Sequence, residues 1–304
     1  MTFNIEGIVG ALRSSRGTVA RKVGSDGRVL DLPSPRDLAD VVSGLTSALF
    51  PRRFGGARGA SNGSLDYFVG NALARALDVL HGQVVRELGF TASLSSQGLV
   101  DATQTAQVIV QEFADGLPGI LDVLYDDIRA AYDGDPSAKS QDEVLLSFPG
   151  VKALIHHRLA HALYKLDVPI IARIIAEHSH SATGIDIHPG AEIGGSFFID
   201  HGTGVVIGET AVIGERVRLY QAVTLGAKRF SVDETGALVK GLPRHPIVED
   251  DVVIYAGATI LGRVTIGRGS VIGGNVWLMR SVPPNSNIVQ AHARSDTFDG
   301  GAGI

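Results

Sequence analysis

The chain of 304 residues contains no cysteine and no long apolar run, and its 27 basic residues are outnumbered by 32 acidic ones. The lack of cysteine excludes disulfide bonds, thiolate metal sites and a cysteine nucleophile. The formal net charge is −5 at pH 7, so the sequence has no basic footprint for nucleic acid. The most apolar stretch, residues 168–176, is interrupted by Arg173 and is too short to span a bilayer. We therefore expect neither nucleic acid nor a membrane as a partner, and a cytoplasmic location.

What the chain does contain is an aliphatic residue at every sixth position of its C-terminal part. Neither an α-helix, with a period of 3.6, nor a β-strand, with a period of 2, produces this repeat. A parallel β-helix does, because three short strands form each coil and the aliphatic side chain of each strand points inward. The repeat positions are Ile187, Ile193, Ile199 and Val205, then Ile207, Ile213, Leu219 and Leu225, and finally Val248, Ile254, Ile260, Ile266, Ile272 and Leu278.

Residues before about 180 follow a helical pattern instead. Ser34, Pro35 and Asp37 form a helix start, with a capping side chain, a proline at the first helical position and an acid two residues later. Further apolar residues at helical spacing predict helices over 34–49, 64–88, 102–132 (with a kink expected at Pro118), 142–163 and 168–178. Glycine-rich segments predict loops at 55–63 and 134–140.

These patterns predict an α+β protein, in which an N-terminal α-helical domain is followed by a parallel β-helix of hexapeptide repeats. We expect a leader over 1–33, disordered or helical, and the helical domain over 34–183. The β-helix is expected over 184–284, and a flexible C-terminal tail over 285–304, which is rich in glycine at its end.

Polar residues interrupt the six-residue repeat at two places, and these are the candidate sites of chemistry. At the first, Asp186 and His201 are slightly less than one coil apart, so we expect them to lie near each other on adjacent coils. A carboxylate that holds one ring nitrogen of a histidine leaves the other free to take a proton from a hydroxyl group. An isolated pair of this kind can equally serve only to hold a turn.

The second place is an irregular segment between Leu225 and Val248, where the repeat fails altogether. A long loop that leaves a regular solenoid is more often part of a site than of the packing. Arg244, near its end, can bind a carboxylate through two parallel hydrogen bonds. The alternative is a surface turn imposed by Pro243 and Pro246.

Several segments together resemble the serine O-acetyltransferases, a family of hexapeptide-repeat acyltransferases. They are Asp186-Ile187-His188-Pro189-Gly190-Ala191, Asp200-His201-Gly202-Thr203-Gly204, Ile207-Gly208-Glu209-Thr210-Ala211, Gln221-Ala222-Val223-Thr224-Leu225-Gly226 and Arg244-His245-Pro246. The resemblance covers residues 134–284, with Gly134-Asp135-Pro136 as an acidic-proline turn. It implies a left-handed β-helix, a homotrimer or a dimer of trimers with active sites between subunits, and acetyl transfer from acetyl-CoA to the hydroxyl of L-serine.

Carried over position by position, the resemblance implies a role for each site residue. His201 is the general base, and Asp186 is the carboxylate that orients it. Asp135, Asp200, Arg244 and His245 hold the ammonium and carboxylate groups of serine. Acetyl-CoA is a co-substrate that contacts Ala227, Gly257, Ala258, Gly274 and Asn275, and no resident cofactor or metal is implied.

The C-terminal Gly303-Ile304 resembles the family's terminus, whose isoleucine enters the active site of O-acetylserine sulfhydrylase. Ile304 is therefore the expected contact with this partner in a cysteine synthase complex. The sequence also departs from the family, because the 227–242 loop is longer and Ala227 replaces a glycine. Gln290 to Arg294 lack the usual glycine and proline, which puts the adenine contact of CoA in doubt.

Two other functions remain open at this point. One is acetyl transfer to a sugar or antibiotic hydroxyl, which accounts for the repeat and one histidine but not for Asp186, Asp200 and Arg244 together. The other is a zinc carbonic anhydrase on the same fold, for which His188, His201 and His245 would have to converge on one metal. His157 and His161 have metal-like spacing on one helix face, but no third ligand completes a site, so we expect a packed or solvated face.

Overall fold

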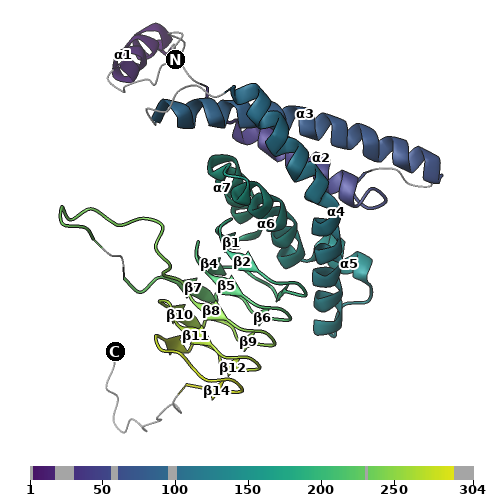
Figure 1. The fold of residues 1–304 in the computed structure, drawn as a ribbon, viewed down its shortest axis with the longest axis vertical. Coiled ribbons are helices and arrows are strands. Elements are labelled where there is room, and N and C mark those ends of the chain that lie inside the picture. The colour runs from purple at the N-terminus through teal and green to yellow at the C-terminus, as the bar shows by residue number, and fades with distance from the viewer. Residues whose placement is uncertain (1–2, 18–30, 56–60, 95–100, 230–231, 291–304) are drawn as a thin grey trace.

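The computed structural model describes residues 3–17, 31–55, 61–94, 101–229 and 232–290. A helical region precedes a column of short parallel strands, and the helices lie over one end of that column (Figure 1). The helices are α1 (Ile5–Gly17), α2 (Pro35–Leu49), α3 (Asn62–Leu94), α4 (Ala102–Gly134), α5 (Gln141–Ser147), α6 (Pro149–Lys165) and α7 (Pro169–Thr183). None of the helices in this part of the chain is both long and apolar enough to cross a membrane.

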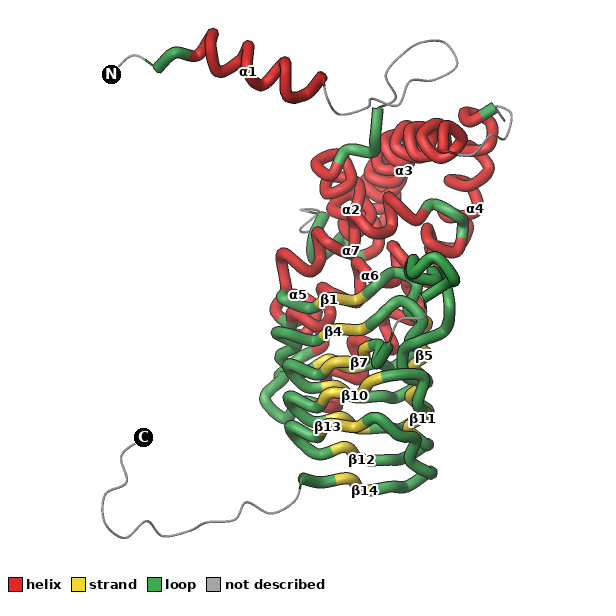
Figure 2. Tube along the Cα trace, turned by 90° about the vertical axis from the view of Figure 1, so that its left-hand side faces the viewer, coloured by secondary structure: helices red, strands yellow, loops and turns green. Residues whose placement is uncertain are grey.

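The strands stack into three parallel sheets that form the faces of a prism, as the repeat predicts (Figure 2). Face 1 contains β1 (Asp186–Ile187), β4 (Val206–Ile207), β7 (Thr224–Gly226), β10 (Thr259–Leu261) and β13 (Trp277–Leu278). Face 2 contains β2 (Glu192–Ile193), β5 (Val212–Ile213), β8 (Ile247–Val248) and β11 (Thr265–Ile266). Face 3 contains β3 (Phe198–Ile199), β6 (Arg218–Leu219), β9 (Val253–Ile254), β12 (Val271–Ile272) and β14 (Asn287–Ile288).

The repeat positions form the core of this left-handed parallel β-helix. All fourteen predicted aliphatic side chains are buried, apart from Ile193, which is partly buried. The small or β-branched residue four positions after a repeat residue is buried as well, as Val252 and Ala258 are. Trp277, which precedes the repeat residue Leu278, points outward and is 64% exposed. The prediction of the fold from the six-residue period is therefore confirmed.

Three expected helices differ from the structure in their bounds. The helix expected over 168–178 is α7, which continues to Thr183. The helix expected to begin at Ser64 begins at Asn62, because Ser61 caps it: the Ser64 N–H donates to Ser61 Oγ at 3.4 Å. The single helix expected over 142–163 is divided into α5 and α6 at Phe148. Pro149 follows Phe148 and disfavours the helical conformation there, and Phe148 has the extended angles φ −81° and ψ 120°.

Other helix ends follow their local sequence closely. Ser34 caps α2 by accepting from the Asp37 N–H, as expected, and Asp101 caps α4. α4 continues as a helix through Pro118. α7 ends at Gly184, whose φ of 70° lets the chain turn directly into β1. Helix α1 lies within the expected leader, and residues 3–16 are all exposed.

A buried ion pair fixes the helices to the first coil of the prism. Arg158 on α6 lies 3.0 Å from Asp127 on α4, and Asp127 is fully buried. Arg158 also donates to the carbonyl groups of Ile193 and Gly194, while the Phe197 N–H donates to Asp127. Burial raises the pKa of Asp127 to about 6, although Arg158 opposes the shift. These bonds set the position of the helices relative to the coil that carries the candidate site.

Candidate active site

Two corners of the prism interrupt its regular coils. We name the corner between faces 3 and 1 the catalytic corner; it comprises residues 200–205, 220–223, 255–258 and 273–276. We name the corner between faces 1 and 2 the loop corner; it comprises residues 188–191, 208–211, 227–229, 232–246 and 262–264. The candidate site residues from the sequence analysis lie at the irregular segments of these two corners.

The catalytic corner contains a two-residue insertion in its first coil. The paired residues Asp186 and Val206 are 20 positions apart, whereas Val206 and Thr224 are 18 apart. The extra residues form a tight turn with positive φ at His201 (57°), Gly202 (84°) and Gly204 (78°). Such angles are uncommon for a histidine, and they direct its side chain outward, where it is 70% exposed.

Acidic groups surround His201 at this corner. Asp200 Oδ1 lies 3.6 Å from His201 Nδ1. Hydrogen bonds from Ser137 lower the pKa of Asp135, and the charges of His201 and Arg218 contribute smaller shifts in the same direction. The Ser137 N–H donates to Asp135 at 2.8 Å. The structure thus brings together three of the residues implied for base catalysis and for binding of the serine ammonium group.

Asp186 begins β1 beside the same corner and is partly buried. Within the described chain no hydrogen bond joins it to His201, and Asp200 is the acid that faces Nδ1. The role of Asp186 in orienting the imidazole remains a prediction.

The loop that carries Asp135 is held against face 3 by a close approach of Gly134. The guanidinium group of Arg218 lies 5.1 Å from the centroid of the Phe198 ring. A Cβ atom on residue 134 would lie 2.8 Å from Phe198 Cδ1 and would also clash with the Arg218 guanidinium. Gly134, Phe198 and Arg218 therefore fix the place of the Asp135 carboxylate.

If the substrate is serine, as the sequence resemblance implies, Gly134→Ala should raise the KM for serine about tenfold or more, because the added methyl group displaces the turn that carries Asp135. The KM for acetyl-CoA should stay close to its original value. Steady-state kinetics with each substrate varied in turn will measure both. Gly119→Ala is the matched control, since nothing lies within 4 Å of a Cβ at that position on α4. A KM for serine that is equal in the two variants would contradict the placement of Asp135.

The loop corner holds Arg244 in a network of hydrogen bonds. Its guanidinium donates to Glu209 Oε2 at 2.5 Å, and the Tyr164 hydroxyl donates to Glu209 Oε1 at 3.1 Å. Burial alone would raise the pKa of Glu209, but Arg244 and Tyr164 outweigh it and the net shift is downward. Arg244 is therefore oriented before any substrate binds.

His245 is held in one tautomer at the same corner. The Thr210 N–H donates to His245 Nδ1 at 3.0 Å, so a neutral ring carries its proton on Nε2. Burial and the charge of Arg244 lower the pKa of His245 to about 4. Gly208 leaves the space for this ring, because a Cβ there would overlap it. At neutral pH His245 is consequently a hydrogen-bond donor and a poor base.

The two groups of residues lie at different corners of the same chain. Face 1, whose strands β1, β4, β7, β10 and β13 are labelled in Figure 2, lies between the two corners. Asp200 and His201 belong to the catalytic corner, whereas Arg244 and His245 belong to the loop corner. The predicted acetyl-CoA residues are divided in the same way: Gly257, Ala258, Gly274 and Asn275 lie further along the catalytic corner, and Ala227 lies at the loop corner. Gly274 and Asn275 are exposed, whereas Ala258 is buried in the prism and can offer only its backbone.

Among the described residues, the remaining histidines do not form a common centre. His188 Nε2 lies 2.8 Å from Arg173, and burial and that charge lower its pKa to about 4. His188 and His245 belong to the loop corner and His201 to the catalytic corner. His157 is buried beside His161, with ring centroids 5.6 Å apart, which agrees with a packed face.

Some residues of this site were not among the sequence predictions. Glu209 and Thr210 lie inside the quoted motif Ile207-Gly208-Glu209-Thr210-Ala211, and that motif was the available signal. Tyr164 and Arg218 reach the site from a helix and from the outer side of a strand, and no local pattern marks them. Ile304 lies outside the described residues.

Comparisons with known proteins identify the family of the chain. The sequence model described as "Bacterial transferase hexapeptide (six repeats)" matches residues 245–280. A protein of Synechococcus elongatus named "Serine acetyltransferase, plasmid" is 55% identical over 309 residues, covering 100% of this chain and 96% of its own. The chain belongs to the serine acetyltransferase family.

Solved structures of the family also match. Serine acetyltransferase 1 of Entamoeba histolytica, in complex with L-cysteine, has a TM-score of 0.72 and 37% identity, with 83% of this chain and 86% of that chain covered. The enzyme of Brucella abortus in complex with coenzyme A has a TM-score of 0.55 and 29% identity, with 84% and 94% covered. Neither alternative function, on a sugar hydroxyl or as a carbonic anhydrase, gains support from these matches.

Proposed function

We propose that this protein transfers the acetyl group of acetyl-CoA to the hydroxyl of L-serine, giving O-acetyl-L-serine and CoA, the first step of cysteine biosynthesis. The observation that carries the proposal is the inserted turn of the catalytic corner, which presents His201 beside Asp200 and Asp135 in a chain 55% identical to a serine acetyltransferase. We further propose a cytoplasmic enzyme without a resident cofactor.

The reaction follows from the groups at the two corners. His201 takes the hydroxyl proton as the serine oxygen attacks the thioester carbon, and the C–S bond then breaks. The departing thiolate of CoA takes the proton back from His201, so no net proton is gained or lost. Asp135 and Asp200 attract the ammonium group, and the guanidinium of Arg244 and the Nε2–H of His245 bind the carboxylate. Because both substrates are held together, no covalent enzyme intermediate is needed.

We propose that the complete site forms between two copies of the chain. The catalytic corner supplies the base and the loop corner supplies the carboxylate-binding groups, and face 1 keeps them apart within one chain. A three-sided prism places these corners next to each other when three copies pack around a common axis. The enzyme is therefore a homotrimer, or a dimer of trimers, with acetyl-CoA along the groove between neighbouring prisms.

A thiol-release assay tests the activity directly. Acetyl-CoA is supplied with L-serine, L-threonine, a galactoside or water alone, and free CoA is measured. We expect CoA release that depends on serine. Folded protein that releases CoA only with the galactoside, or with none of the acceptors, would contradict the proposed function.

Arg244→Lys should raise the KM for serine about tenfold and leave the KM for acetyl-CoA nearly unchanged. Lysine retains the charge but loses the planar fork that binds a carboxylate through two hydrogen bonds. Arg268→Lys is the control, because Arg268 is exposed and pairs with Asp250 on another edge of the prism. Equal increases in both KM values for Arg244→Lys would make Arg244 a structural element of the loop.

We also propose O-acetylserine sulfhydrylase as a partner, bound through Ile304. A terminal aliphatic residue with a free carboxylate suits a pocket built for an amino-acid carboxylate. Deletion of Ile304 should abolish binding of the sulfhydrylase, measured by calorimetry, and leave serine acetylation unchanged. Undiminished binding by the truncated chain would place the contact elsewhere.

A further inference from the structure

Four residues occupy the same position in successive coils of the prism, where face 3 meets the catalytic corner. They are Asp200, Tyr220, Tyr255 and Gly273, and each directly follows a strand of face 3. The backbone N–H of each one donates to the last residue of the next strand. Neighbouring parallel strands are about 4.8 Å apart, so Tyr220 is the immediate neighbour of Asp200 along the prism.

The two tyrosine rings in this row stack on each other. Their centroids are 5.0 Å apart and their planes differ by 9°. Tyr255 therefore covers one face of the Tyr220 ring, and the opposite face is turned toward the coil that carries Asp200. Arg218 approaches Tyr220 at its edge: the guanidinium donates to the Tyr220 hydroxyl at 3.4 Å and lies over the ring of Phe198.

The uncovered face of Tyr220 adjoins the acids that are proposed to attract the ammonium group of serine. An aromatic face attracts a cation that lies within about 6 Å of the ring centroid. An ammonium group bound to Asp200 is in that range, because one strand spacing separates Asp200 from Tyr220. The side chain of Asp200 is only 16% exposed. A cation held there is partly withdrawn from water, which strengthens its attraction to the ring.

We propose that the ring of Tyr220 binds the ammonium group of the acceptor by a cation–π contact, and that Tyr255 is a positioning residue that holds this ring. The inference rests on the proposed function and adds a determinant of specificity to it. A hydroxy acid without an ammonium group gains nothing from the ring. An amino acid with a hydroxyl group gains the ring contact in addition to the two carboxylates, so Tyr220 favours serine over acceptors that lack the ammonium group.

Tyr220→Leu should raise the KM for serine about tenfold, the loss expected when a partly shielded cation–π contact is removed. The KM for acetyl-CoA should stay close to its original value. Tyr220→Phe keeps the ring and should change the KM for serine much less. Tyr255→Leu should also have a smaller effect, because the ring of Tyr220 remains in place.

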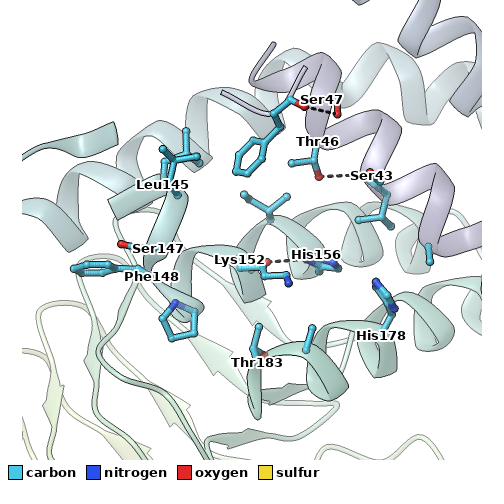
Figure 3. Close-up of a pocket in the computed structure, with 17 residues that line it drawn as sticks. Ser43, Thr46, Ser47, Leu145, Ser147, Phe148, Lys152, His156, His178 and Thr183 are labelled. Carbon is cyan, nitrogen blue, oxygen red and sulfur yellow. Dashed lines mark hydrogen bonds between the residues drawn. The ribbon is translucent and has the colours of Figure 1, made fainter. Parts of the chain in front are cut away.

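Phe54→Leu is the matched control for the loss of an aromatic ring. Phe54 is 39% exposed and lines a cavity of about 560 Å³ between α2 and the helices α5 to α7 (Figure 3). None of the residues that line this cavity belongs to the catalytic corner or to the loop corner. Both KM values should therefore be the same in Phe54→Leu and in the original chain.

Stepwise fluorination separates the attraction of the ring from its shape. Phenylalanine with one, two or three ring fluorines at position 220 keeps nearly the same volume, while the negative charge on its face becomes progressively weaker. We expect the KM for serine to rise with each fluorine and the KM for acetyl-CoA to stay constant. Calorimetry with L-serine on the full chain should give the same order of affinities without turnover.

An unchanged KM for serine in Tyr220→Leu, equal increases in both KM values, or a KM for serine that does not depend on fluorination would overturn the role of Tyr220. The fluorinated forms keep the ring, so they decide the question even if Tyr220→Leu does not fold. Failure of the proposed function is recognised separately, because the original chain would then release no CoA with serine. If the original chain does release it, any of these three results counts against Tyr220 alone.

Discussion

His201→Ala should lower turnover by about 10²–10⁴, because the serine hydroxyl is a poor nucleophile until a base removes its proton. No other described group at the catalytic corner is as well placed, and His245 has a pKa lowered to about 4. The turnover number, measured at saturating serine and acetyl-CoA, reports this loss.

The backbone conformation of residue 201 is unfavourable for alanine, so a second variant is needed. Its φ of 57° favours asparagine over alanine, so His201→Asn removes the imidazole with less strain on the turn. Both variants should show a similar loss of turnover. His180→Ala, on the exposed end of α7, serves as the control and should retain full turnover. If His201→Asn kept a near-normal turnover number, another group or water would have to act as the base.

Asp127→Ala should lower the free energy of unfolding by about 3–5 kcal/mol, because it leaves the charge of Arg158 buried without its partner. The Phe197 N–H also loses its acceptor. Urea unfolding followed by circular dichroism measures the loss. Asp126→Ala is the control, since the neighbouring Asp126 forms only an exposed pair with Arg129 at 3.8 Å.

A double variant separates the ion pair from the space that it fills. Asp127→Leu with Arg158→Met replaces both charges by apolar groups, and we expect it to recover part of the stability lost in Asp127→Ala. If Asp127→Ala unfolds at the same urea concentration as Asp126→Ala, the pair does not hold the helices on the first coil.

Much of the β-helix could be predicted from the sequence because its interactions are local and periodic. Each coil repeats the same short strand and the same turn, so the position of Ile260 in the prism follows from that of Ile254 by counting. The helix starts at Ser34 and Asp101 depend on side chains within three residues of the backbone they cap. The division at Phe148 was missed although its cause, Pro149, stands in the sequence.

The candidate site could be predicted only in part. The two-residue jump between Val205 and Ile207 marks the turn of His201, and the failure of the repeat after Leu225 marks the loop of Arg244. Neither of these two signals in the sequence shows which acid faces His201 Nδ1. In the structure that acid is Asp200 rather than Asp186. Arg218 and Tyr164 reach the site from elements that are distant in the sequence, so local patterns could not identify them.

The sequence by itself determined the prism, its inward side chains and the two interruptions, because each depends on residues a few positions apart. Only the tertiary structure decided that the two interruptions lie at different corners. The corner at which each interruption lies depends on how many strands separate the two interruptions around a coil. The buried Asp127–Arg158 pair likewise arises where distant segments pack together, and its burial gives these two groups properties that no single segment has.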